Sequence, residues 1–147
     1  MALFFVVLAV GAGSLIPVQA GVNASLRSVL GSPVLATISN FVVGLSLLTG
    51  YAVASQVRMP TLSHLATAPW WYWLGGSMGA LLVLSGVVLS HRLGATTFVA
   101  CIILGQLTAS VVIDHFGWVG FSQSPISVQR IAGLVFLVTG VALIHRS

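Results

Sequence analysis

Long, nearly uninterrupted runs of apolar residues divide this chain, and short polar segments separate them. The runs are too long and too continuous for membrane β-strands, which alternate in polarity and need only about 10 residues. A helix that crosses a bilayer core about 30 Å thick needs about 20 residues, at about 1.5 Å per residue. The runs therefore predict an all-α transmembrane bundle of five helices, over residues 3–22, 33–55, 70–90, 94–113 and 125–146.

The start of the last predicted helix depends on its cap, because the apolar stretch between Arg130 and His145 is too short to cross alone. Ser124 followed by Pro125 is typical of an N-cap residue and a proline at the first helical position. We therefore predict that this helix begins at Pro125. Arg130 would then extend toward the headgroups or face a protein interior.

The connections between the apolar runs are short, and none is of low complexity or strongly charged. The longest cover residues 56–69 and 114–124, where proline, glycine and serine favour loops. No basic residue precedes the first run, so we expect it to remain as a helix rather than to be cleaved as a signal peptide. The chain is expected to form one transmembrane domain over residues 1–147.

Composition indicates that lipid, not water, surrounds this chain. Hydrophobic residues make up 58% of the sequence and charged residues 4%, and the mean hydropathy is +1.13. An average globular protein carries about 25% charged residues. The charged residues here are arginines and a single aspartate, and the net charge is +4. A soluble enzyme, a nucleic-acid-binding module, a disordered tail and a disulfide-stapled secreted domain are excluded.

The arginines are distributed almost evenly over the two membrane faces. In a five-helix topology Arg27, Arg92 and Arg146 lie on one face, and Arg58 and Arg130 lie on the other. This distribution favours a cytoplasmic C-terminus, because positive residues prefer the cytoplasmic side. It is also the pattern of a chain that inserts in both orientations. Two oppositely inserted copies would form a ten-helix carrier with inverted repeats.

Three amide side chains are expected at similar depth in the first two helices. Gln19 and Asn23 are four residues apart on the first helix, and Asn40 lies about 10 Å into the second from the same membrane face. Polar groups in hydrocarbon need a partner or a wet cavity. These amides could meet, either to line a solute cavity or simply to bond one helix to another.

A polar stripe follows the fourth helix, where Gln106, Ser110 and Asp114 are spaced four residues apart. Trp73 belongs to an aromatic cluster at the start of the third helix, which forms either an interfacial belt or one wall of a cavity. The candidate substrate-binding residues are Gln19, Asn23, Asn40, Trp73, Gln106 and Ser110.

Asp114 is the only acid in the chain, and it lies at the edge of the fourth helix. Arg130 lies on the same membrane face, so we expect Asp114 and Arg130 to form a charge pair. The alternative is that Asp114 takes part in proton coupling. No carboxylate occupies the middle of any apolar run. Neutral or anionic solutes are therefore favoured over cationic drugs.

Small residues at helical spacing predict close contacts between helices, because lipid supplies no hydrophobic force that drives helices together. The predicted packing positions are Gly75, Gly76, Gly79, Gly105, Gly133 and Gly140.

The residues that usually carry catalysis or bind metals are scattered. His64, His91, His115 and His145 lie in connections or at helix ends, without the spacing of a metal site. Cys101 is interpreted as a small apolar filler. We expect no catalytic residue, no metal and no cofactor, and therefore a protein that is not an enzyme.

A series of prolines, polar residues and glycines runs through the first, third, fourth and fifth helices. Its members are Pro17, Gln19, Asn23, Leu26, Gly75, Gly76, Gly79, Gly105, Gln106, Ser110, Asp114, His115, Phe116, Gly117, Gly120, Arg130, Gly133 and Gly140. This series resembles the YdcZ-type family of five-helix membrane proteins. The resemblance covers essentially the whole chain, and the part on the fourth helix is its most specific element.

That family is similar to half of the ten-helix carriers of the drug/metabolite transporter superfamily. The resemblance implies a small-molecule exporter of the inner membrane in which five helices pair with a second five-helix unit. We expect alternating access in a dimer, either an oppositely oriented homodimer or a pair with a related five-helix chain. The small four-helix exporters of the superfamily carry an acid in the first helix, which this chain lacks. The competing hypothesis is a non-transporting subunit or scaffold that packs through its glycine-rich helix faces.

Overall fold

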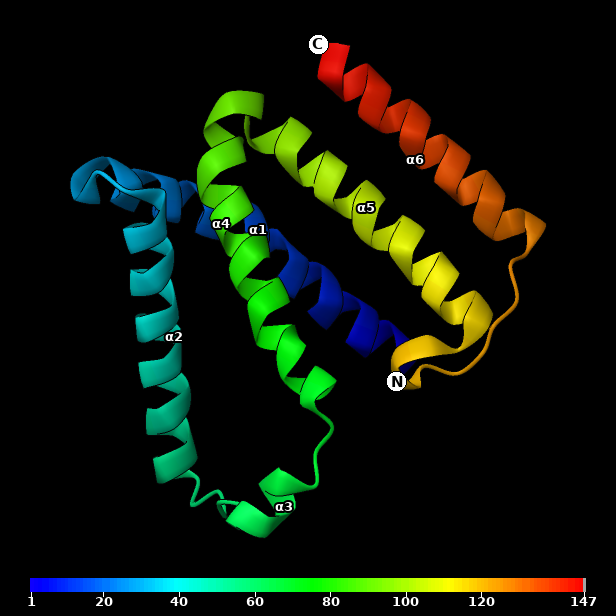
Figure 1. The fold of residues 1–147 in the computed structure, drawn as a ribbon. Helices are drawn as coiled ribbons and strands as arrows, with labels where there is room; N and C mark the ends of the chain where they lie inside the picture. Colours follow the sequence, from blue (N-terminus) through cyan, green and yellow to red (C-terminus); the bar gives the residue numbers. More distant parts are fainter. Residues whose placement is uncertain (147) are drawn as a thin grey trace. The chain divides into compact units, whose positions relative to one another are not determined.

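The structure is a computed structural model that describes residues 1–146, and five of its helices are long and apolar enough to cross a membrane. These helices are α1 (Ala2–Leu30), α2 (Pro33–Ala54), α4 (Leu74–Leu93), α5 (Ala95–Phe116) and α6 (Val128–Arg146), shown in Figure 1. The connections contain α3 (Leu62–Ala66) and the 3₁₀ turns η1 (Trp70–Trp73) and η2 (Trp118–Gly120). No strand occurs within the described residues, and the predicted all-α transmembrane fold class is confirmed.

The chain divides into two compact units. The α2–α4 unit comprises Val18–Arg92, and the α5–α6 unit comprises Met1–Pro17 together with the chain from Leu93 onward. Pro17 lies inside α1 at the boundary, where its ring removes one N–H group from the helical hydrogen bonds. That both units form one domain stays a prediction.

A tight turn joins α1 to α2 in the α2–α4 unit. Gly31 adopts a φ of 70°, and its N–H donates to the Arg27 carbonyl oxygen at 2.8 Å. Glycine enters this left-handed conformation without a Cβ clash and therefore ends α1. The Ser32 hydroxyl accepts a hydrogen bond from the Leu35 N–H at 3.4 Å, and Pro33 begins α2. The α1–α2 boundary thus follows from local capping rules.

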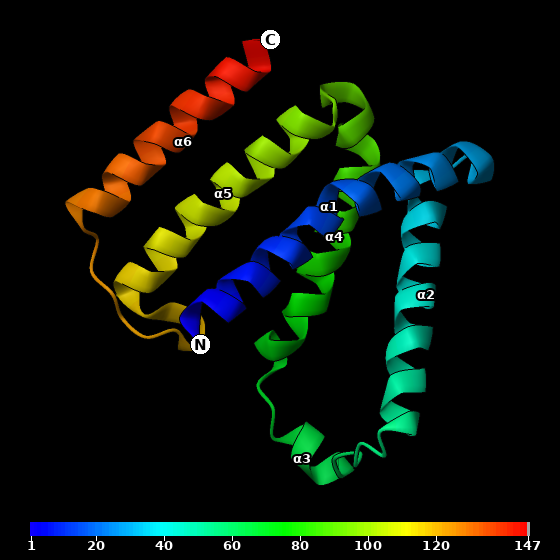
Figure 2. The same ribbon diagram turned by 180° about the vertical axis from the view of Figure 1, so that it is seen from behind.

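Mostly small residues are buried where the second half of α1, the start of α2 and the end of α4 come together. They are Ala20, Asn23, Ala24, Ala36, Thr37, Gly86 and Val87. Small side chains let helix backbones approach closely, so this end of the unit is packed. Toward their other ends, α2 and α4 diverge, and the connection that contains α3 bridges them (Figures 1 and 2).

The α5–α6 unit contains an antiparallel helix pair, in which α5 and α6 lie side by side (Figures 1 and 2). Phe98 near the start of α5 and Val141 near the end of α6 are buried, as expected for neighbours in an antiparallel pair. Gly117 ends α5 in the left-handed conformation, with a φ of 64°. The turn η2 and an extended segment then lead to α6.

The predicted start of the last helix is wrong, because α6 begins at Val128 rather than at Pro125. Its cap is Ser127, whose hydroxyl accepts a hydrogen bond from the Arg130 N–H at 3.3 Å. The predicted cap, Ser124, is used differently, since its carbonyl oxygen accepts a bond from the Arg130 guanidinium at 3.1 Å.

The first helix is longer than its predicted span, since α1 continues past residue 22 to Leu30. Ser25 and Ser28 do not break it, because their hydroxyls donate to carbonyl oxygens inside the same helix. The helix ends only at Gly31, where the backbone changes hand.

The remaining helices follow the predicted spans with smaller shifts. α2 ends at Ala54 rather than at residue 55. The span predicted over 70–90 starts with the turn η1 and continues as α4 to Leu93. The span predicted over 94–113 is α5, which extends to Phe116 because Gly117 supplies the first C-terminal cap.

Candidate functional site

Two amide side chains from different helices meet in the α2–α4 unit. Gln19 Nε2 of α1 donates a hydrogen bond to Asn40 Oδ1 of α2 at 3.4 Å. Gln19 is exposed and Asn40 is partly buried. The predicted meeting of these two amides is confirmed, and they bond one helix to the other.

Asn23, the third amide predicted at this depth, does not join that bond. Its side chain is only 4% exposed, and it makes no hydrogen bond within residues 1–146. Asn23 therefore retains donor and acceptor capacity that a solute or a second chain can use.

A groove of about 620 Å³ lies between α2 and α4. Its lining includes Thr37, Phe41 and Leu45 of α2 and Ser77, Ala80 and Leu84 of α4. None of the lining residues is charged. The Thr37 hydroxyl donates to the Pro33 carbonyl oxygen at 2.9 Å, so it is satisfied within α2. A small, mostly apolar molecule fits the size and chemistry of this groove.

None of the groove residues was predicted from the sequence. Apolar side chains that line a groove are of the same types as side chains that face lipid, and no local signal separates them. The predicted site residue nearest to the groove along the chain is Asn40, which directly precedes Phe41.

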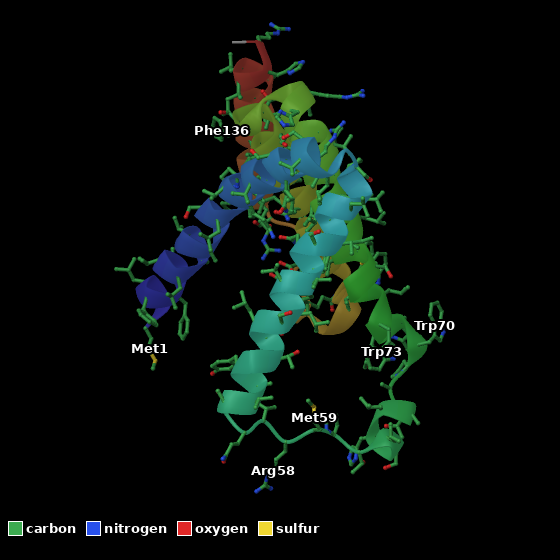
Figure 3. The ribbon with its side chains drawn as sticks, turned by 90° about the vertical axis from the view of Figure 1, so that its left-hand side faces the viewer. Met1, Arg58, Met59, Trp70, Trp73 and Phe136 are labelled. Carbon is green, nitrogen blue, oxygen red and sulfur yellow. The ribbon has the colours of Figure 1, made fainter. Side chains whose placement is uncertain are left out.

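Trp73 lies at the start of the α4 span, and its side chain is 60% exposed. In Figure 3 the side chains of Trp70 and Trp73 project to different sides of this segment. Trp70, Trp71 and Tyr72 form successive edge-to-face ring pairs, with centroids 6.0 and 6.1 Å apart. Both interpretations of Trp73, an interfacial belt and a cavity wall, stay predictions.

Gln106 and Ser110 are exposed on α5, in the other unit. Neither side chain makes a hydrogen bond within the described chain. A site that these residues share with Gln19, Asn23 and Asn40 stays a prediction.

Asp114 and Arg130 form the predicted charge pair, with 3.4 Å between Arg130 Nη1 and Asp114 Oδ2. The Arg130 side chain is 34% exposed, and the Asp114 side chain is 33% exposed. Partial exposure weakens such a pair, and its contribution to stability is about 1 kcal/mol at most. A role of this pair in coupling stays a prediction.

The residues after Asp114 form the corner between α5 and α6. His115 Nδ1 accepts a hydrogen bond from the Ile126 N–H at 3.3 Å, and the His115 carbonyl oxygen accepts one from Gln123 Nε2 at 3.1 Å. A Cβ atom on Gly117 would lie 3.2 Å from the Gln123 Cβ. His115 and Gly117 belong to the most specific part of the sequence pattern, and they therefore have a structural role in forming this corner.

The predicted packing glycines have open space around them. A Cβ atom added at Gly75, Gly76, Gly79, Gly105, Gly133 or Gly140 would meet no heavy atom within 4 Å. The close contacts predicted for these glycines therefore do not occur within the unit to which each glycine belongs. Contacts with a second chain stay a prediction.

Other potential reactive groups form no cluster. Among residues 1–146, no group of three or more histidine, cysteine or acidic side chains could hold a metal ion. Cys101, interpreted as a small apolar filler, is exposed on α5.

Comparison with known protein families gives a match over nearly the whole chain. The family model described as "Putative inner membrane exporter, YdcZ" matches residues 4–143, nearly the whole chain. No curated protein and no solved structure matches. Five apolar helices agree with a multi-pass protein of the inner membrane. The chain belongs to the YdcZ family of the drug/metabolite transporter class, as its sequence pattern predicted.

Proposed function

We propose that this protein exports small molecules across the inner membrane, as a dimer of five-helix chains that works by alternating access. The groove between α2 and α4 is the proposed solute-binding surface, and its volume of about 620 Å³ without a charged lining residue is the observation that carries the proposal. Small-molecule sites are concave and largely apolar, with a few polar groups that orient the ligand.

The chemistry of the groove favours a neutral, largely apolar solute. A cation bound there would lack a counter-charge, and burying an unpaired charge is costly. The single acid, Asp114, is already paired with Arg130. Ser77 supplies a polar group in the groove for such a solute.

A dimer would cover polar and small surfaces that one chain leaves open. Gln106 is exposed on α5 without a hydrogen bond within residues 1–146, and an unsatisfied amide is unfavourable in hydrocarbon. At most 17% of the most apolar window of any spanning helix is buried. The even distribution of arginines suits a partner of opposite orientation, which would create inverted repeats. A related five-helix chain is the alternative partner.

Filling the groove tests the proposed site. Ala80→Phe places a ring in the groove, whereas Leu82→Phe adds a ring on the same helix at a position outside the groove lining. Each protein is reconstituted in liposomes, and counterflow is measured with a panel of labelled neutral and anionic solutes. Overpacking of the site should reduce counterflow of the transported solute about tenfold or more for Ala80→Phe. Leu82→Phe should stay close to wild type.

Equal counterflow in the two variants would remove the groove from the transport path. A wild-type protein that moves no solute of the panel, but co-purifies with an unrelated membrane complex, would favour the scaffold hypothesis instead.

A further inference from the structure

A second cavity lies in the α2–α4 unit, next to the turn between α1 and α2. It has a volume of about 400 Å³, and its lining residues are Ala24, Arg27, Ser28, Gly31, His91 and Arg92. Two arginines and a histidine thus share one cavity without a carboxylate among its lining residues. We propose that this cavity binds a phosphate group, carried either by an anionic phospholipid or by a soluble phosphate.

The sequence leaves these arginines without an internal counter-charge. Its single acid, Asp114, lies in the other unit and is paired with Arg130. Two positive side chains beside the same cavity repel each other, and an anion between them replaces the repulsion with two attractions. The lining supplies no negative charge of its own, and a bound anion would relieve this repulsion.

Arg27 is held in place with most of its donors unused. Its Nη1 donates to the Val87 carbonyl oxygen of α4 at 3.4 Å, and the guanidinium is partly buried. A guanidinium has five N–H donors in a planar fork that matches the oxygens of a phosphate. The Arg92 side chain makes no hydrogen bond in the described part of the chain. Both arginines can therefore bind one phosphate group.

The cavity also lies at a depth that suits a lipid phosphate. Arg27 lies in the last turn of α1, after the apolar span predicted over residues 3–22. His91 and Arg92 lie in the last turn of α4, directly after its apolar run. Basic pockets between transmembrane helices bind anionic headgroups at this level.

Helix dipoles explain only part of this arrangement. Positive side chains are favourable in the last turn of a helix, where the dipole is negative. That effect accounts for Arg27 on α1 and for His91 and Arg92 on α4 separately. It does not explain why the basic residues of two helices line the same cavity.

Calorimetric titration of the purified full-length chain in detergent tests the proposal. The three probes are short-chain phosphatidylglycerol, phosphatidylcholine of the same chain length, and inorganic phosphate. We expect phosphatidylglycerol to bind more tightly than phosphatidylcholine. Arg92→Gln should weaken this binding about fivefold, and the double variant Arg27→Gln/Arg92→Gln about 25-fold.

The matched control for Arg92→Gln is Arg58→Gln, which removes one charge at a residue of the same unit that does not line the cavity. Arg58 lies in the connection between α2 and α3 (Figure 3). The control should change the affinity less than about twofold, because distant surface charges are screened. If the double variant does not fold, the single variant Arg92→Gln decides the outcome. This substitution removes no hydrogen bond of the described structure.

The probes also separate the two sources of the phosphate. Loss of phosphatidylglycerol binding in the cavity variants, without competition from inorganic phosphate, assigns a lipid headgroup. Binding of inorganic phosphate that the same variants lose assigns a soluble phosphate. Equal losses in the cavity variants and the control, or no loss in either, would overturn the proposal.

Discussion

Gly117 determines how α5 ends and how the corner to α6 is folded. Its φ of 64° is strained for other residues, and a Cβ atom would lie 3.2 Å from the Gln123 Cβ. We predict that Gly117→Ala lowers the free energy of unfolding by about 1–2 kcal/mol. Denaturant unfolding in detergent measures this change.

The control for this prediction is Gly50→Ala. Gly50 lies within α2, and a Cβ atom there meets nothing within 4 Å. Alanine in a helix interior is about 0.5–1 kcal/mol more favourable than glycine, so this variant should be at least as stable as wild type. A Gly117→Ala protein as stable as Gly50→Ala would contradict the structural role of the corner.

Residue contacts were predictable where polar groups were scarce. The single acid and an arginine on the same membrane face left few alternatives to the contact between Asp114 and Arg130. Gln19 and Asn40 were expected at equal depth in neighbouring helices, and this similarly predicted the hydrogen bond between them. The α2–α4 groove was not predictable, because its apolar residues have the same composition as a lipid-facing surface.

The helices themselves were predictable from their length and continuous hydrophobicity, but their ends depended on local caps. The start predicted for the second span, at residue 33, agrees with α2, which begins at Pro33 after the cap residue Ser32. The start of α6 was missed because two serines three residues apart, Ser124 and Ser127, both suit an N-cap. The end of α1 was missed because polar residues near a helix end were interpreted as its limit, whereas the helix continues to Gly31.

The open glycine surface of α4 leads to a prediction about the dimer. Gly75 is exposed, and no heavy atom lies within 4 Å of an added Cβ. If a second chain packs there, Gly75→Leu should raise the dimer dissociation constant about tenfold or more, because leucine prevents close approach. Energy transfer between labelled chains in liposomes measures this constant.

Gly50→Leu serves as the matched control, since Gly50 has equal space around it but lies outside the predicted packing positions. It should leave energy transfer near the wild-type level. Wild-type energy transfer in the Gly75→Leu protein would show that the dimer does not use this face of α4.

Residues 1–146 contain five helices that can span the membrane and that have little buried surface, which corresponds to half of the architecture proposed for transport. In the most apolar windows of these helices the buried share lies between 0% and 17%. Apolar side chains tolerate lipid. A second chain would explain together the groove, the open glycines and the exposed amides. We therefore expect two chains of opposite orientation in each working transporter.

Single-vesicle measurements test whether a working transporter contains two chains of opposite orientation. Each chain carries one dye at its C-terminus, and solute flux and dye number are recorded in the same liposome. We predict that flux-competent vesicles contain two dyes, and that an impermeant external quencher extinguishes one of them. Equal flux from vesicles with a single dye, or two dyes that are always quenched together or not at all, would contradict the account.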